Sequence, residues 1–135
     1  MPPRQFSLEE ANGLLPRLGE KLGRLQEMKR RQDELQEKVR DYQARMTGDG
    51  HLLETEVNEA RREMAKAAAE VNTLIEQVQA LGCEVKDVDQ GLVDFRTVMD
   101  GREVYLCWKL GEPSIGWWHE LEAGYAGRQP LRGKV

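Results

Sequence analysis

The residues best suited to chemistry lie in the last third of the chain, where acids, a cysteine and a histidine alternate with aromatic residues. Carboxylate, thiolate and imidazole groups are the ligands that zinc and similar ions take in proteins. These residue types indicate a divalent metal or acid–base site built from Asp94, Cys107, Glu112, His119 and Glu120. The histidine does not begin an HExxH helix, because residue 123 is alanine, and the chain has no CxxC pair.

A β-hairpin is predicted to bring two of these groups together. Two runs of alternating apolar and polar residues, 91–98 and 103–110, flank Asp100-Gly101, which is a strong signal of a type I′ turn. If these two residues form the loop, Asp94 lies opposite Cys107 on one face of the hairpin. The other face is apolar and is expected to pack.

The polar face of this hairpin has a second interpretation, as a surface that recognises a small ligand or a protein partner. Its members would be Asp94, Arg96, Tyr105, Cys107 and Lys109, with Trp118 and Arg128 beside them. Under this interpretation no cofactor is needed.

The orientation of His119 depends on how a third strand, within residues 115–121, pairs with the hairpin. A tight turn around residues 111–114 places Trp117 in the packed layer, Trp118 on the polar face and His119 opposite Leu106, on the packed side. A single β-bulge would turn His119 towards Asp94. Without it, His119 is expected to be a buried residue that hydrogen-bonds a carbonyl or the neighbouring acid.

Cys107 and Arg128 also have plainer interpretations. A free cysteine in a strand is usually a small buried hydrophobic residue, so Cys107 is expected to pack unless basic neighbours activate its thiol. The glycine-rich segment 124–128 is not followed by a helix, as a phosphate loop would be. Arg128 is therefore expected to pair with a Glu or Asp, or else to clamp an anion.

The part of the chain that precedes the hairpin is predicted to be helical. Ser7 and Glu10 form a capping box at the start of a short helix. A kink or break should follow, with Pro16 in the first turn of a longer helix. Heptad spacing follows to about residue 46, and again in Leu53, Val57, Ala60, Met64, Ala67, Val71, Leu74, Val78 and Leu81. Between the ladders, residues 47–51 form a short predicted turn, so the two helices must run antiparallel.

These elements define an α+β fold: a long, coiled-coil-like antiparallel helical hairpin, a small antiparallel sheet of three to four strands, and an irregular C-terminal tail. The helical hairpin is expected over residues 7–82, the sheet over 83–122 and the tail over 123–135. At 135 residues, the chain is expected to form a single domain.

Composition excludes several classes of function. A net charge of −4 argues against a nucleic-acid-binding protein, because phosphate binding needs a basic surface. The sequence has neither an apolar run of membrane-spanning length nor a signal-peptide core, so we expect a cytoplasmic protein that does not bind membranes. Two cysteines are too few for a disulfide scaffold.

Several segments resemble a prokaryotic family known as domain of unknown function 2203. They are FSLEEANGLLP, GCEVKD, GLVDFRTVMDGREVYLCWKLGE and WHELEAGYAGRQPL, so the resemblance covers nearly the whole chain. It implies a helical hairpin with a small C-terminal β element. It supplies no reaction, ligand or catalytic residue.

Two functional hypotheses remain open. The first is a non-enzymatic module in which two helical hairpins associate as a homodimeric four-helix bundle and the sheet binds a protein or ligand. The dimer is expected from small residues beside the second ladder: Ala65, Ala68, Ala69, Asn72 and Ile75. The second hypothesis is a metal-dependent, hydrolase-type protein with a zinc-like ion on the C-terminal β unit.

Overall fold

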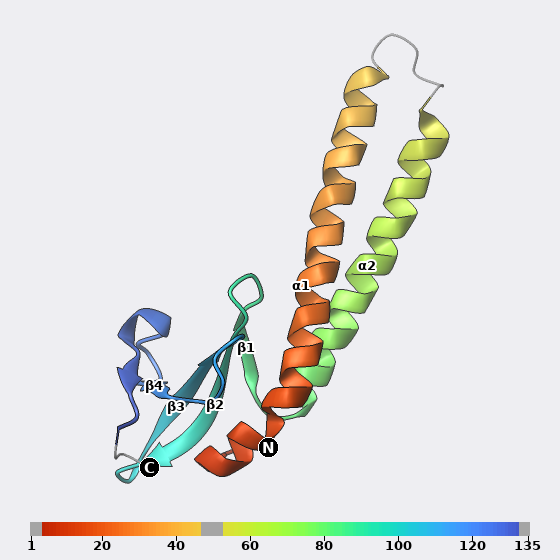
Figure 1. The fold of residues 1–135 in the computed structure, drawn as a ribbon. Coiled ribbons are helices and arrows are strands. Elements are labelled where there is room, and N and C mark those ends of the chain that lie inside the picture. Colours follow the sequence, from red (N-terminus) through yellow and green to blue (C-terminus); the bar gives the residue numbers. More distant parts are fainter. Residues whose placement is uncertain (1–3, 47–52, 133–135) are drawn as a thin grey trace.

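A computed structural model describes residues 4–46 and 53–132 and confirms the predicted α+β fold. Two long helices precede a five-stranded antiparallel sheet (Figure 1). The helices are α1 (Leu8–Arg45) and α2 (Glu54–Ala80). The strands are β1 (Glu84–Asp87), β2 (Leu92–Met99), β3 (Arg102–Lys109), β4 (Trp117–His119) and β5 (Gln129–Pro130), with a 3₁₀ turn, η1 (Tyr125–Gly127), before β5.

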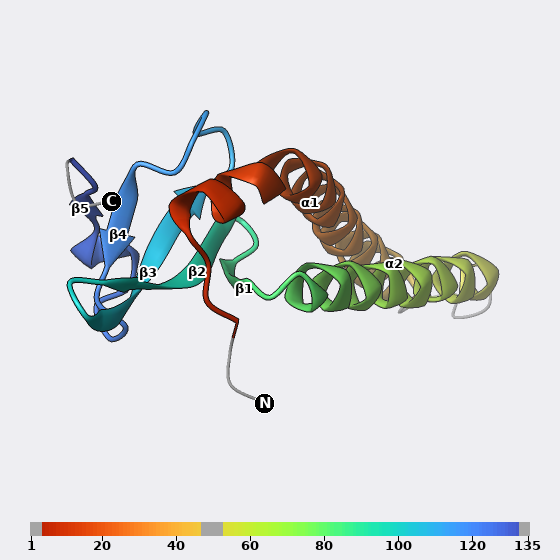
Figure 2. The same cartoon turned by 90° about the horizontal axis from the view of Figure 1, so that it is seen from below.

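The start of α1 is capped and bent. The capping box is confirmed: the Glu10 amide donates to Ser7 Oγ at 3.0 Å, and the Ser7 amide donates to Glu10 Oε1 at 2.9 Å. α1 continues through Pro16 without a break. The prediction of a short separate helix before Pro16 is therefore wrong. Figure 2 shows the first turns of α1 at an angle to the rest, which is what a proline without an N–H produces.

The two helices run antiparallel and bury the predicted ladder positions. Far from the sheet, Leu35 and Val39 of α1 pack against Val57 and Ala60 of α2. The predicted turn at residues 47–51 lies outside the described residues. Figure 1 shows that the C-terminal half of α1 and the N-terminal half of α2 project beyond the sheet. These halves are therefore held by one narrow apolar seam.

A second core lies where the sheet meets the start of the helical hairpin. Here α1 also buries Ala11, Leu15 and Leu22, which lie outside the predicted heptad positions, in the same cluster as side chains of the sheet. Phe95 of β2 and Phe6 meet edge to face, with ring centroids 5.2 Å apart. This core fixes one face of the sheet and leaves the other face to the candidate site.

The β2–β3 hairpin has the predicted register. Asp94 pairs with Cys107, and Asp100 and Gly101 form the turn with positive φ values of 52° and 78°. The tail was predicted to be irregular, and this is wrong at one point: Gln129 and Pro130 pair with β4 and add a fifth strand.

The predicted register of the third strand is wrong by one residue. His119 pairs with Tyr105 and Trp118 with Leu106, so His119 lies on the polar face and Trp118 in the core. Before β4, the Ile115 amide donates to Asn12 Oδ1 at 2.8 Å, which ties this connection to α1. Pairing with β3 begins only at Cys107 and Trp117, and each paired residue of β4 stands one position earlier than the tight turn at 111–114 predicts.

Candidate functional site

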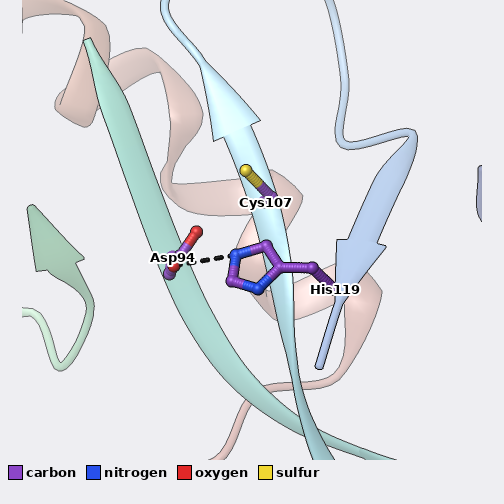
Figure 3. A group of neighbouring side chains, drawn as sticks. All are labelled: Asp94, Cys107 and His119. Atoms are coloured by element: carbon purple, nitrogen blue, oxygen red, sulfur yellow. Dashed lines mark hydrogen bonds and ion pairs between the residues drawn. The ribbon is translucent and has the colours of Figure 1, made fainter. Parts of the chain in front are cut away.

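The core of the site is formed by three neighbouring strands that direct a carboxyl, a thiol and an imidazole to the same point. Asp94 comes from β2, Cys107 from β3 and His119 from β4 (Figure 3). One ligand atom from each, a carboxylate oxygen, Sγ and a ring nitrogen, lie within 4.8 Å of one another. All three side chains are buried, with exposed fractions of 2%, 1% and 2%. We call these three residues the triad.

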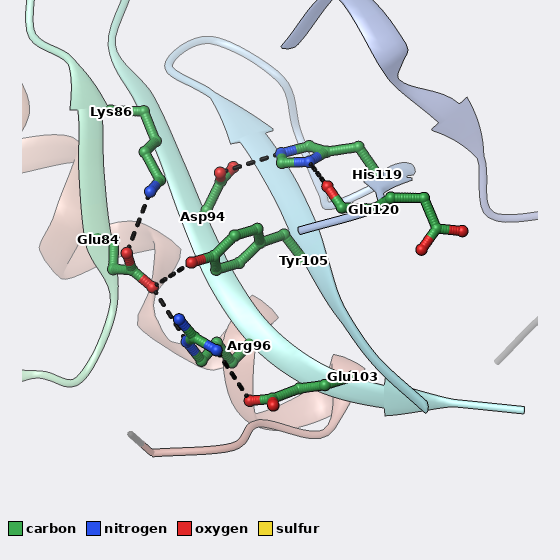
Figure 4. Close-up of polar contacts among 8 residues, drawn as sticks. All are labelled: Glu84, Lys86, Asp94, Arg96, Glu103, Tyr105, His119 and Glu120. Carbon is green, nitrogen blue, oxygen red and sulfur yellow. Dashed lines mark hydrogen bonds and ion pairs between the residues drawn. The ribbon is translucent and has the colours of Figure 1, made fainter. Parts of the chain in front are cut away.

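Two hydrogen bonds fix the imidazole of His119. Nδ1 lies 2.7 Å from the carbonyl oxygen of Glu120, and Nε2 lies 3.0 Å from Asp94 Oδ2 (Figure 4). A carbonyl oxygen can only accept, so Nδ1 carries the proton that it donates. In a neutral ring Nε2 is then the bare nitrogen, and its lone pair points at the Asp94 carboxyl group.

Without a cation, the hydrogen bonds and the burial of the triad determine which of its atoms carry protons. Asp94 and Nε2 need one proton between them, because two lone pairs cannot form a hydrogen bond. Burial raises the pKa of the Asp94 carboxyl, against the opposing effect of His119. Burial, reinforced by the negative charge of Asp94, also raises the pKa of the Cys107 thiol to about 12. Cys107 is thus a thiol at neutral pH and a weak nucleophile.

A small pocket opens over the triad, with a volume of about 210 Å³. Its other lining residues come from β1, from the start of β2, from Tyr105 on β3 and from the segment after β4. They are Lys86, Leu92, Tyr105, Leu121, Glu122, Gly124 and Tyr125. The triad thus forms the floor of a cavity that a molecule from solvent can reach.

A network of charged residues borders one side of the pocket (Figure 4). Glu84 accepts hydrogen bonds from Tyr105 Oη at 2.8 Å and Lys86 Nζ at 3.1 Å, and Arg96 Nε lies 3.4 Å away. Burial opposes ionisation of Glu84, but these partners keep the pKa of its carboxyl below the ordinary value. The network fixes Lys86 and Tyr105 in the pocket wall.

Comparison with known proteins gives a single assignment. A family model described as "Uncharacterized conserved protein (DUF2203)" matches residues 4–131. The chain belongs to the DUF2203 family. Neither the comparison with curated proteins nor that with solved structures gave a match. The chemistry of this DUF2203 chain must therefore be argued from its own residues.

Two of the five predicted metal ligands lie apart from the triad. Glu112 binds Arg128, with Nη2 to Oε1 at 2.8 Å, as expected for an arginine paired with an acid. The side chain of Glu120 pairs with Arg102, so only its backbone carbonyl takes part in the site. The DUF2203 site consequently offers three ligands and not five.

The predicted recognition face is not a flat exposed surface in this DUF2203 chain. Asp94, Tyr105 and Cys107 are buried, and Trp118 lies in the core. Arg128 is held between Trp117 and Tyr125, with its guanidinium carbon 4.9 and 4.8 Å from their ring centroids. Arg96 and Lys109 are half-buried at the margins. The face is a pocket with a rigid border.

Several pocket residues were not predicted to line a site. Lys86 lies on β1 and Leu92 at the start of β2, while Leu121 and Glu122 end the predicted sheet and Tyr125 lies in the predicted irregular tail. Their spacing carries no signal, because the path of the chain after β4 decides which side chains face the triad.

No helix in residues 4–46 or 53–132 is long and apolar enough to cross a membrane.

Proposed function

We propose that this protein binds a divalent ion of the zinc class through Asp94, Cys107 and His119, and that the ion acts on a molecule bound in the pocket. The observation that carries the proposal is the hydrogen bond from His119 Nδ1 to the Glu120 carbonyl, at 2.7 Å. It leaves Nε2 free of a proton beside a carboxylate oxygen and a thiol sulfur.

This arrangement matches the support that metal-binding histidines usually have. A ligating imidazole donates its other N–H to a carbonyl or carboxylate, which selects the tautomer and holds the ring in place. In this site the Glu120 carbonyl has that role.

The charges of the triad also favour a cation. Burying ionisable groups costs several kcal/mol each unless a partner compensates. Asp94 and Cys107 are both almost completely buried, and the negative charge of Asp94 raises the pKa of the Cys107 thiol. A divalent ion replaces the protons of the carboxyl–imidazole pair and the thiol, and it balances the carboxylate and the thiolate.

The number of ligands indicates a site of the catalytic type. Structural zinc sites use four protein ligands, while catalytic sites use three and leave one position for water or substrate. The triad supplies three, and the pocket lies above it. We therefore propose a site at which the ion polarises a bound group or activates a water, as in metal-assisted hydrolysis.

Cobalt titration of the metal-free protein tests the proposal. One equivalent of Co²⁺ is expected to bind and to produce a thiolate-to-cobalt charge-transfer absorption. The absorption should be absent in Cys107→Ser and present in Cys83→Ser, since Cys83 is also buried but lies outside the triad. A wild-type protein that stays folded and gives no such absorption refutes the metal site.

We keep a second proposal, homodimer formation through the helices, because α2 has a stripe of small residues beside its seam. Ala65 and Ala69 are exposed, and Ala68 and Ile75 are half-buried. Small side chains at this spacing allow a second helix to approach closely. Two hairpins would then form a four-helix bundle.

A further inference from the structure

The size of the pocket limits what can bind above the triad. Its volume of about 210 Å³ is below the roughly 300–1,000 Å³ of pockets that take drug-sized ligands. A nucleotide or a folded peptide segment is therefore too large to enter it. A short organic molecule fits.

The rim of the pocket is unusually apolar for this chain. In the described ranges, 4–46 and 53–132, the large apolar side chains that are well exposed are Val98, Trp117, Leu121 and Tyr125. Leu121 and Tyr125 both line the pocket, with exposed fractions of 39% and 40%, and Leu92 forms the wall below. Exposed apolar groups around a polar floor mark a place where the apolar part of a ligand lies.

Lys86, with 42% of its side chain exposed, places a positive charge in the pocket wall that favours an anion. Among the described residues that line the pocket, Lys86 is the only lysine or arginine. Its ammonium group is held 3.1 Å from Glu84 Oε1 and 4.9 Å from the centroid of the Tyr105 ring. Glu84 is shared with Tyr105 and Arg96, so it does not balance Lys86 alone.

The acids of the pocket do not cancel this preference. Asp94 and the Cys107 thiolate neutralise a divalent ion, so the ion with its three protein ligands carries no net charge. Glu122 and Lys86 are both exposed, so water and salt screen both charges, but Lys86 is held in the wall by Glu84 and against the Tyr105 ring. A ligand that enters the pocket thus meets Lys86 beside the open position of the ion.

From this geometry we infer that the pocket takes a small organic carboxylate with a short apolar body. The carboxylate binds the ion's open position next to Lys86, and the apolar body lies against Leu92, Leu121 and Tyr125. This inference rests on the proposed metal site and names the class of molecule that the site accepts.

Three matched probes test the inference on the cobalt-loaded protein: hexanoate, its neutral amide hexanamide, and acetate. Hexanoate is expected to change the visible spectrum of the bound cobalt and to bind at least about tenfold more tightly than either of the others. Acetate lacks the apolar body, and hexanamide lacks the charge. Equal binding of hexanamide and hexanoate would show that Lys86 selects no anion and would overturn the inference.

Two variants assign the effect to the pocket walls. Lys86→Gln should weaken hexanoate binding about tenfold with little change in cobalt affinity. Tyr125→Ala should reduce the preference for hexanoate over acetate. Lys66→Gln, on the exposed face of α2, is the matched charge control and should change neither. Unchanged hexanoate binding in both pocket variants contradicts the inference.

The inference and the proposed function fail in different ways. If the wild-type protein binds no cobalt, the metal site is wrong and the carboxylate site falls with it. If cobalt binds through Cys107 but the spectrum does not respond to hexanoate, the metal site stands and only the ligand class is wrong.

Discussion

His119 on β4 reaches across β3 to Asp94 on β2, and 3.0 Å separates its Nε2 from Asp94 Oδ2. The two residues are 25 positions apart in the sequence and are both nearly inaccessible to solvent. A proton or a cation must lie between them, because both atoms otherwise present lone pairs. This relationship is the basis of the proposed metal site.

Replacing Asp94 by asparagine separates stability from metal binding. The asparagine amide can donate to Nε2 of the neutral imidazole, so Asp94→Asn should keep the free energy of unfolding within about 1 kcal/mol of wild type near neutral pH. Zinc affinity should fall by more than the roughly 10–100-fold that loss of an outer-shell partner costs. Chemical denaturation and zinc competition measure the two effects.

The same variant should change how stability depends on pH. The pKa of Asp94 is raised in the folded state above its ordinary 3.8, so the folded protein binds this proton more tightly than the unfolded chain does. Protonated Asp94 therefore contributes to the stability of the wild-type protein at low pH. This contribution is lost as the pH rises from 3.8 through the folded pKa. Asp94→Asn should not lose stability in this way over the same pH range. If the free energies of unfolding of the two proteins change with pH in parallel, Asp94 is not the group responsible.

Zinc binding should release protons. The Cys107 thiol, with a pKa of about 12, gives up one proton, and the Asp94–His119 pair gives up the proton that it shares. About two protons per zinc are therefore expected near neutral pH, and the apparent affinity should rise with pH. Calorimetry in buffers of different ionisation enthalpy measures the number. Cys107→Ser should release about one proton, and zinc binding without proton release is incompatible with these ligands.

A pair of glycine variants tests the local geometry that supports the site. Gly91, just before β2, has φ of 68°, and a Cβ there would lie 2.6 Å from Leu110 Cβ. Gly101, in the β2–β3 turn, has φ of 78° and nothing within 4 Å of such a Cβ. Both alanine variants should lose about 1–2 kcal/mol of stability from the left-handed backbone.

Gly91→Ala should lose more than Gly101→Ala, because it must also displace Leu110. Thermal denaturation of the two variants side by side measures the difference. Equal losses would mean that the contact between residue 91 and Leu110 is not close in solution.

The proposed dimer predicts a concentration-independent mass over the micromolar range. Sedimentation of the wild-type protein should give twice the chain mass, and Ala65→Glu should shift it towards the monomer, because a charge is placed in the helix contact. Glu76→Gln, on an exposed position of the same helix, is the control. A wild-type monomer at these concentrations rules out the dimer.

Much of the fold follows from local sequence patterns. The capping box at Ser7, the heptad positions and the register of the β2–β3 hairpin are each set by residues close in sequence, so they were predictable. The pairing of Asp94 with Cys107 follows from that register. The placement of His119 does not, because it depends on the path of residues 110–116, where Ile115 contacts Asn12 of α1, 103 residues away.

The pocket was out of reach of sequence reasoning for a similar reason. Lys86 and Tyr125 meet the triad only because β1 and the segment after β4 lie on opposite sides of it. Arg128, by contrast, was expected to pair with an acid and does so with Glu112. Residue type predicted its kind of partner, while only the path of the chain determined which acid it meets.

The most direct test of the metal site is X-ray absorption at the zinc edge of the zinc-loaded protein. The account predicts one sulfur at about 2.3 Å and nitrogen or oxygen ligands at about 2.0–2.1 Å. The sulfur should disappear in Cys107→Ser and remain in Cys83→Ser. The imidazole contribution should disappear in His119→Gln and remain in His51→Gln. A wild-type zinc shell without sulfur, or one that keeps its sulfur in Cys107→Ser, would contradict the assignment of Asp94, Cys107 and His119 as the ligands.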